Sequence, residues 1–335
     1  MATFCLNSKK HHTGTTLCGV FIIVVIFLTM PAFPEDKFIL PNRLGPKNFD
    51  YKIINAFVNS GDKGILTAFK GDPEMRGTHL QLSYYLKAGE SFKAEFLIGN
   101  YTDQVVDYFI LCLMDYKQQE FVFNGKRATS HPVSIKPGER VIYAVTLDNI
   151  EKGAHDFLLI AVKTLRDSDN PAEADFPLLF HRANIFVESY SFPRISYNEF
   201  YQKPSDFQVF KIVINKSQEV NHFEELYYDT KSSSDKLQFY IHINNSYSDD
   251  ALHFAIVPFD DTKQISFRQL DENVLYYYLK SKTKSVIKVN ADLKYQKGSL
   301  WAINIDNPYS RLETEDGRMA QIPTIVRISN TIKFR

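Results

Sequence analysis

The sequence is poor in cysteine and tryptophan and has no excess of charge of either sign. It contains three cysteines, one tryptophan and a formal net charge of zero over 335 residues. Cys5 and Cys18 lie at the N-terminus, so Cys112 alone follows and no intrachain disulfide can form there. The absence of disulfides fits a bacterial envelope protein better than an exported animal domain. The chain lacks the excess of basic residues that nucleic-acid-binding proteins have, so we expect no nucleic acid as a partner.

Common catalytic motifs are also missing. The sequence has no G-x-S-x-G, H-E-x-x-H, Walker A or G-x-G-x-x-G pattern. Cys112 lies within the apolar stretch 108–114, which predicts a small buried hydrophobe rather than a thiol nucleophile. We therefore expect that the protein is not an enzyme. A β-rich glycan hydrolase, which would need two carboxylates in a cleft, stays an alternative.

One long apolar run is present, at residues 17–33 (LCGVFIIVVIFLTMPAF), and Lys9 and Lys10 precede it. A basic flank before an apolar run places the N-terminus in the cytoplasm and the rest of the chain outside the membrane. The run is short for a span and long for a signal-peptide core, and Met30 makes a poor cleavage site. We predict a single-pass signal-anchor in the cell membrane. A cleaved signal peptide, which would give a secreted protein, and a buried core helix are the alternatives.

The remainder of the chain has the pattern of short strands. It is rich in Phe and Tyr, and alternating apolar segments such as 79–86, 91–98 and 140–147 recur between turn signals. This spacing predicts an all-β sandwich. Residues 51–58 and 64–69 are expected to form an edge hairpin. Residues 268–280 are the best helical candidate, but they suit a strand equally well.

Two parts of the chain share an ordered set of residues, which indicates an internal duplication. Asn100 to Asp103, an apolar strand and then Asp115-Tyr-Lys-Gln118 match Asn245 to Asp249, an apolar strand and then Asp261-Thr-Lys-Gln264. Such a repeat predicts two copies of one sandwich. The predicted organisation is a cytoplasmic tail (1–16), the anchor or signal (17–33), an extended stalk (34–47), a first sandwich (48–191), a linker (192–205) and a second sandwich (206–335).

In the first copy, one strand is preceded by 86–90 (LKAGE) and ends in Gly99-Asn100, another strand follows 136–139 (KPGE), and a penultimate strand follows 148–153 (DNIEKG). With this pattern, the first copy resembles bacterial exported immunoglobulin-like and fibronectin-III-like sandwich modules. The second copy has 281–284 (SKTK) in place of the Pro-Gly-Glu element. The Cys…Trp…Cys pattern of antibody domains is absent. The resemblance implies two tandem Ig-like domains and carries no functional residues.

Calcium is the metal that the sequence suggests. A run of oxygen ligands, namely Asp167, Asp169, Asn170, Glu173 and Asp175, has the density that calcium requires. The corresponding loop of the second copy offers Asp306, Asn307, Glu313, Glu315 and Asp316. Neither loop has the sixth-position glycine of the twelve-residue calcium loop, so a solvated acidic turn is the alternative. We expect no other cofactor.

Two further groups are candidates for binding. His222, Glu224 and Glu225, with His242 or His253, could ligate zinc, although their spacing matches no common template. Tyrosines 84, 85, 227, 228 and 276–278 could form a stacking platform for a glycan or a protein, or could simply pack across strands.

Taken together, these features predict a non-catalytic, membrane-anchored, extracytoplasmic protein that binds or assembles at the cell envelope. Its expected partners are the membrane, through residues 17–33, and an envelope protein or glycan. A secreted carbohydrate-binding or adhesion module is the main alternative.

Overall fold

The computed structural model of the chain describes most of its C-terminal three quarters. The described residues are 64–72, 74–78, 82–164, 178–204, 212–215, 218, 236–245, 249–266, 273–292, 298–314, 318–320, 325–329 and 331–334. They form strands and turns without any helix, and so none that could cross a membrane. The predicted tail, anchor and stalk (1–16, 17–33 and 34–47) lie outside the described residues.

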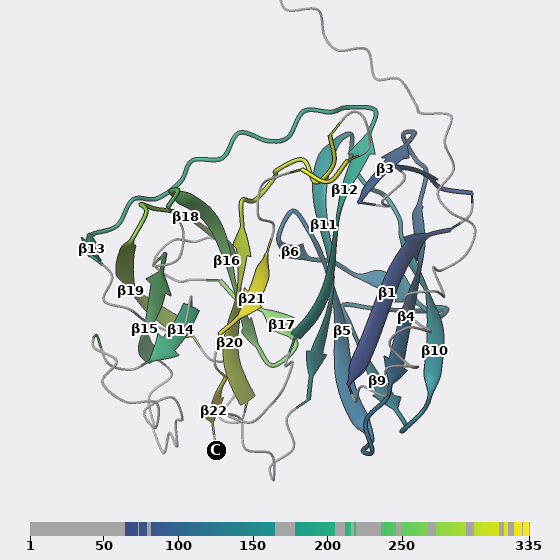
Figure 1. The fold of residues 1–335 in the computed structure, drawn as a ribbon, viewed down its shortest axis with the longest axis horizontal. Coiled ribbons are helices and arrows are strands. Elements are labelled where there is room, and N and C mark those ends of the chain that lie inside the picture. Colours follow the sequence, from purple (N-terminus) through teal and green to yellow (C-terminus); the bar gives the residue numbers. More distant parts are fainter. Residues whose placement is uncertain are drawn as a thin grey trace, which may run out of the picture. The chain divides into compact units, whose positions relative to one another are not determined.

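Strands β1 to β12, here called the first half, form two sheets (Figure 1). The five-stranded sheet has the order β1 (Ile65–Gly71), β4 (Phe92–Asn100), β10 (Arg140–Leu147), β7 (Phe121–Phe123), β8 (Lys126–Ala128). The seven-stranded sheet has the order β2 (Arg76–Gly77), β3 (Ser83–Leu86), β12 (Leu178–Val187), β11 (Gly153–Lys163), β5 (Val106–Met114), β6 (Lys117–Gln118), with β9 (Ser130–Ile135) also paired to β5. Alternate residues of both sheets, such as Phe96, Tyr108 and Leu159, form one core.

Strands β13 to β22, the second half, also form two sheets. The four-stranded sheet has the order β13 (Gln202–Pro204), β19 (Thr283–Asp292), β15 (Lys236–Asn244), β14 (Ile212–Asn215). The six-stranded sheet has the order β17 (Lys263–Gln264), β16 (Leu252–Asp260), β20 (Gly298–Asp306), β21 (Val326–Ile328), with β18 (Leu275–Leu279) paired to β16 and β22 (Ile332–Phe334) paired to β20. Its core includes Ile241, Phe254 and Tyr277. The all-β class is thus confirmed, and these sheets fit the predicted β-sandwich architecture.

The strand pairing of the first half recurs in the second half. β4 pairs β10 as β15 pairs β19, and β5 pairs β6, β9 and β11 as β16 pairs β17, β18 and β20. Asn100 and Asn245 occupy equivalent turns, because the main-chain carbonyl of each accepts a hydrogen bond from an equivalent residue. Gly138 N donates to Asn100 O, and Lys282 N donates to Asn245 O. The repeated sequence elements therefore occupy corresponding places in the two sets of sheets.

The repeat is displaced by two residues in one strand. Asp115 N donates to Asp156 O, and Asp261 N donates to Ser299 O, so the ladders place Asp156 opposite the same point as Ser299. Gly153 and Gly298, each preceded by a lysine in the sequence, are two residues out of this register. An even displacement keeps each side chain on the same face of its sheet, so the inward and outward pattern survives.

The sheet that contains β5 and β11 is covered on both faces. One face of these strands contributes to the first-half core, and the other packs against β16 and β20 through residues such as Leu113, Leu158, Phe259, Trp301 and Ile303. This double burial explains why residues 108–114 of β5 and 157–162 of β11 are continuously apolar instead of alternating. Figure 1 shows β16 and β20 beside β11 and β5.

Several sequence expectations can be placed in this fold. Residues 65–71 form β1, the edge of the five-stranded sheet, as expected, whereas 51–58 lie outside the described residues. Within 268–280, residues 275–279 are strand β18. The predicted linker, 192–205, ends in β13, which pairs with β19. Its strand-forming part thus belongs to the second half.

Candidate functional site

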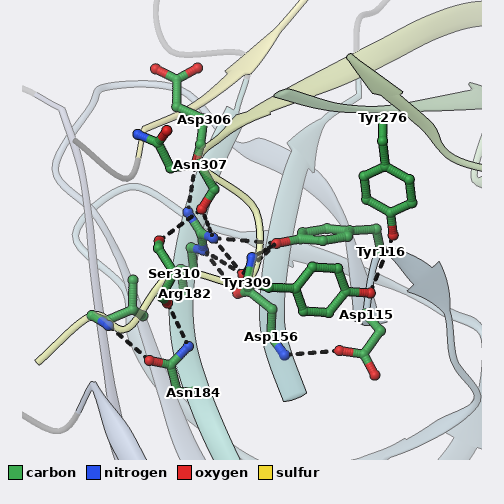
Figure 2. A network of polar contacts seen from close by, with 11 residues as sticks. Asp115, Tyr116, Asp156, Arg182, Asn184, Tyr276, Asp306, Asn307, Tyr309 and Ser310 are labelled. Atoms are coloured by element: carbon green, nitrogen blue, oxygen red, sulfur yellow. Dashed lines mark hydrogen bonds and ion pairs between the residues drawn. The ribbon is translucent and has the colours of Figure 1, made fainter. Parts of the chain in front are cut away.

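The most concentrated group of polar side chains lies where the two halves meet (Figure 2). Asp156 of β11 and Arg182 of β12 come from adjacent strands, and their side chains are 0% and 3% exposed. Arg182 Nε donates to Asp156 Oδ1 at 2.8 Å, and Nη2 donates to Asp156 Oδ2. Burial opposes the charge of Arg182, but the carboxylate of Asp156 outweighs it, so the pKa of Arg182 is raised above its usual value. Arg182 therefore keeps its charge inside the protein.

Tyr116 adds a third buried group. It follows Asp115 in the two-residue turn between β5 and β6, and both residues have positive φ (63° and 52°), as a type I′ hairpin requires. This turn aims the Tyr116 hydroxyl at Asp156, to which it donates a hydrogen bond. Burial, followed by the charge of Asp156, raises the pKa of Tyr116 well above its ordinary value, so the phenol stays protonated.

These three side chains bind main-chain atoms of the second half. Arg182 Nη1 donates to Asp306 O and Nη2 donates to Asn307 O, both at 2.9 Å. Tyr309 N donates to the Tyr116 hydroxyl at 3.0 Å and to Asp156 Oδ2 at 3.1 Å. These hydrogen bonds thus reach the backbone of residues 306–309, which run on from the last residue of β20, and Tyr116 also contacts the Tyr309 ring, with centroids 5.1 Å apart.

Asn184 extends this recognition along the same segment. Asn184 pairs with Asp156 across β12 and β11, so its side chain lies on the same face. It donates to Ser310 O at 3.2 Å and accepts from Leu312 N at 2.8 Å. One amide therefore satisfies a carbonyl and an N–H of the 306–312 segment, as a neighbouring strand would.

A second contact between the halves is reciprocal. Gln118 N donates to Gln264 Oε1 at 2.6 Å, and Gln264 N donates to Gln118 Oε1 at 2.8 Å. The side-chain amide nitrogens make equivalent contacts with the opposite half. Gln118 Nε2 donates to Thr262 O at 2.7 Å, and Gln264 Nε2 donates to Tyr116 O at 2.9 Å. Equivalent residues of the two repeats thus make the same contacts with each other. These four hydrogen bonds have local two-fold symmetry, as in an isologous interface, whereas the contacts of Arg182 and Asn184 run in one direction only.

Apolar side chains surround these polar contacts. Trp301 stacks on Phe259 with ring centroids 4.3 Å apart, and both lie in the cluster that joins the two halves. The Trp301 indole N–H donates to Asp261 O at 2.7 Å, so its polar atom is satisfied. Because water is excluded, the ion pair and the amide contacts act in a low-dielectric environment, where they are stronger than at a surface.

His155 lies at the border of the same region. Its Nδ1 is 2.7 Å from Asp115 Oδ2, and its Nε2 is 2.9 Å from Glu151 O. Burial lowers the pKa of His155, but the hydrogen bond and charge of Asp115 act more strongly together, and the net shift is upward. His155 is a group at this border whose ordinary pKa is close to neutrality.

The predicted calcium and zinc ligands lie partly outside the described residues, and those that are described have protein partners. Asp167, Asp169, Asn170, Glu173 and Asp175 lie outside the described residues, as do Glu315 and Asp316, and His222, Glu224 and Glu225. In the second-half loop the Asp306 carboxylate is bound by Arg327 Nη1 at 2.7 and 2.9 Å, and Glu313 accepts a hydrogen bond from Thr78. Within the ranges that the structure describes, no three His, Cys, Asp or Glu side chains gather as a metal site would require.

The other candidates are largely parts of the core. Tyr84 and Tyr277 are 0% exposed and pack across strands, while Tyr276 faces Tyr309 at the junction, with hydroxyls 3.2 Å apart. Tyr227 and Tyr228 lie outside the described residues. Cys112 is fully buried, and burial raises the pKa of its thiol, which confirms a packing role. His253 packs against Tyr197 with ring centroids 4.3 Å apart.

Sequence reasoning did not find the groups that join the halves. Asp156, Arg182 and Asn184 lie in strands that are otherwise mainly apolar. Charged or amide side chains in such strands are seldom buried without a partner, and this was the signal that could have pointed to them. Gln118 and Gln264 were noticed as repeat markers. Their contact with each other follows only from the way the two halves pack.

No protein-family model matches the chain, and no curated protein matches it. A FixG-related protein from Vibrio parahaemolyticus is 12% identical, with 37% of this chain and 95% of that chain covered and a TM-score of 0.24. A CARDB domain from Pyrococcus furiosus, solved in complex with di-metal ions, is 12% identical, with 37% and 88% covered and a TM-score of 0.22.

Red sea bream transglutaminase is similar to a larger share of this chain, but the match covers a smaller share of the transglutaminase. It is 10% identical, with 87% of this chain and 34% of that chain covered and a TM-score of 0.22. Likenesses this remote carry no argument about function.

Proposed function

We propose that the chain is a non-catalytic, membrane-anchored, extracytoplasmic protein, in which two tandem Ig-like sandwiches form one body that binds or assembles at the cell envelope. The apolar run 17–33 supports the anchor, because Lys9 and Lys10 before it favour export of everything that follows. The recurring strand order of the two halves supports the tandem arrangement.

The observation that carries the proposal is that the buried charge of Arg182 is bound entirely by groups of the two halves in the described structure. The described partners of Arg182 are Asp156, Tyr116 and the carbonyl oxygens of Asp306 and Asn307. Groups saturated in this way are not available to activate a substrate. Their effect is to fix one half against the other, which suits a protein that presents surfaces at a defined spacing.

Binding in such a protein would use loops and sheet edges. Loops at the ends of the sandwiches would offer side chains to a partner, and an exposed strand edge would add main-chain N–H and C=O groups. The anchor would hold these surfaces near the membrane and raise their local concentration.

The test is a crosslinking pulldown from intact cells. Three versions are compared: the full chain, a soluble version that begins at Pro34, and a version in which an unrelated membrane span precedes Pro34. We expect the full chain to capture an envelope protein that the soluble version captures poorly, and the unrelated span to restore the capture. Equal capture by the soluble version would contradict the need for an anchor. Turnover of a glycan by any version would contradict the non-catalytic role.

A further inference from the structure

One face of the second half carries a concentration of lysines. In β19, Ile287 and Val289 belong to the second-half core, so the even-numbered residues of this strand face the other way. Lysines occupy two of these outward positions and the turn before the strand, and β13 adds one more beside them. Together with one tyrosine they form a surface that we call the basic face, which consists of Tyr201, Lys203, Lys280, Lys282, Lys284 and Lys288.

The basic face belongs to the outer layer of the second half. The six-stranded sheet packs against the first half through one face and against the four-stranded sheet through the other. The remaining face of the four-stranded sheet therefore points away from the first half, and Figure 1 shows β13 and β19 on the far side of β16 from β5 and β11. Four of the five lysines are exposed, and Lys284 is half-buried.

The spacing of these lysines favours an anionic partner. Lys203 of β13 lies directly opposite Lys284 of β19, and like charges at opposite positions of a sheet repel each other. Lys282 Nζ is 2.9 Å from Asp249 Oδ1, but the two side chains are 69% and 89% exposed, so solvent weakens this ion pair. A partner that presents several negative charges would offset the repulsion between the lysines.

Tyr201 adds an apolar group to the same face. It is 79% exposed, more than any other large apolar side chain in the part of the chain that the structure describes. It precedes Lys203 by two positions and so lies on the same side of the extended chain. Ser285 Oγ donates to Tyr201 O at 2.8 Å, which holds the main chain against β19 while the ring stays in solvent. Tyrosine rings favour the headgroup level of a bilayer, and neighbouring lysines are attracted to anionic headgroups.

We propose that the basic face docks the second half onto a bilayer that contains anionic lipids. The lysines would contact headgroup phosphates, and the Tyr201 ring would lie among the headgroups. This inference deepens the proposed function and rests on its membrane anchor only for the nearness of the bilayer. At about 3.3–3.6 Å for each extended residue, residues 34–63 can span up to roughly 100 Å, so the anchor leaves the basic face within reach of the membrane.

The test is flotation of the protein with preformed lipid vesicles. The chain used begins at Pro34, because both sandwich cores lie within residues 65–302 and the apolar run 17–33 would bind any bilayer. Vesicles of phosphatidylcholine alone are compared with vesicles in which about a third of the lipid is phosphatidylglycerol. We expect binding to the anionic vesicles alone, and we expect it to weaken as salt shortens the range of the attraction.

Variants locate the binding on the basic face. Lys203→Gln and Lys284→Gln should each weaken vesicle binding about fivefold, and together about 25-fold. Removal of one of two opposite like charges should leave the urea midpoint unchanged or raise it, so weaker binding would not reflect unfolding. Lys203→Arg should retain binding. Lys126→Gln, an exposed change on β8 of the first half, is the matched control and should have no effect.

Tyr201→Ser separates the apolar contribution from the charge. It should weaken binding at low and high salt alike, because salt screens charges and not apolar contacts. Binding to neither kind of vesicle, equal binding to both, or equal effects of Lys203→Gln and Lys126→Gln would overturn the inference. Binding to a soluble anionic polysaccharide without binding to anionic vesicles would overturn it too. The pulldown with the anchored chain does not depend on these results, so the two proposals fail separately.

Discussion

Replacement of Arg182 by alanine should be among the most destabilising single changes at the junction. Asp156 is 0% exposed, and removal of one partner from a buried ion pair costs about 3–5 kcal/mol because the remaining charge is uncompensated. The carbonyl oxygens of Asp306 and Asn307 also lose their donor, at roughly 1–3 kcal/mol for each buried group. The losses share one site and do not add fully, so we expect a total of about 4 kcal/mol.

The assay is urea unfolding of the chain from Pro34 onward, followed by tryptophan fluorescence. Trp301 is the only tryptophan in the sequence and lies in the junction, 3% exposed and stacked on Phe259, so its emission reports on this interface. The matched control is Arg127→Ala, which breaks a partly exposed pair with Asp148 and should cost no more than about 1 kcal/mol. Equal losses for Arg182→Ala and Arg127→Ala would refute the importance of the buried pair.

A double variant distinguishes the cost of an unpaired buried charge from the cost of the lost side-chain packing. Arg182→Met together with Asp156→Leu removes both charges and keeps apolar volume, and replacement of whole buried pairs is often neutral or stabilising. We expect this variant to recover most of the stability that Arg182→Ala loses. A double variant as unstable as the single one would show that the backbone contacts of Arg182, rather than the charge of Asp156, dominate.

Three further predictions concern pH and one turn. Burial lowers the pKa of His181 to about 4 from 6.5, so its contribution is complete above pH 6.5 and is lost as the pH falls toward 4; His181→Phe should remove up to about 3 kcal/mol of acid sensitivity in unfolding experiments. The pKa of His155 is raised from 6.5, so its stabilisation is complete below that pH and is lost as the pH rises through the raised value; Asp115→Asn should abolish this loss, measured as the difference in Tm between about pH 6 and about pH 8. Lys282 has a φ of 52° where the first half has Gly138, so Lys282→Gly should stabilise the protein by about 0.5–1 kcal/mol in urea unfolding, and a loss would contradict the strain argument.

The periodicity of the sequence was informative about strands because it reflects local chemistry. Residues 92–98 of the predicted segment 91–98 lie in β4, and the segment 140–147 coincides with β10, as their alternation predicted. The segment 268–280 was ambiguous, since it is the best helical candidate but contains the run Tyr276 to Tyr278, which suits a strand. Residues 275–279 form strand β18 by pairing with β16. The register of the repeat could not be predicted, because a shift of two residues leaves the face pattern unchanged.

The sequence alone was sufficient for the all-β class and for the repeat, because turn residues and apolar alternation act over a few neighbouring positions. The tertiary structure decided which polar residues matter. Asp156 and Arg182 are 26 positions apart, and the main chain that they bind lies more than 120 positions further on. Their meaning depends on which sheet faces pack together. That choice is made by the area buried between faces, which local sequence patterns do not encode.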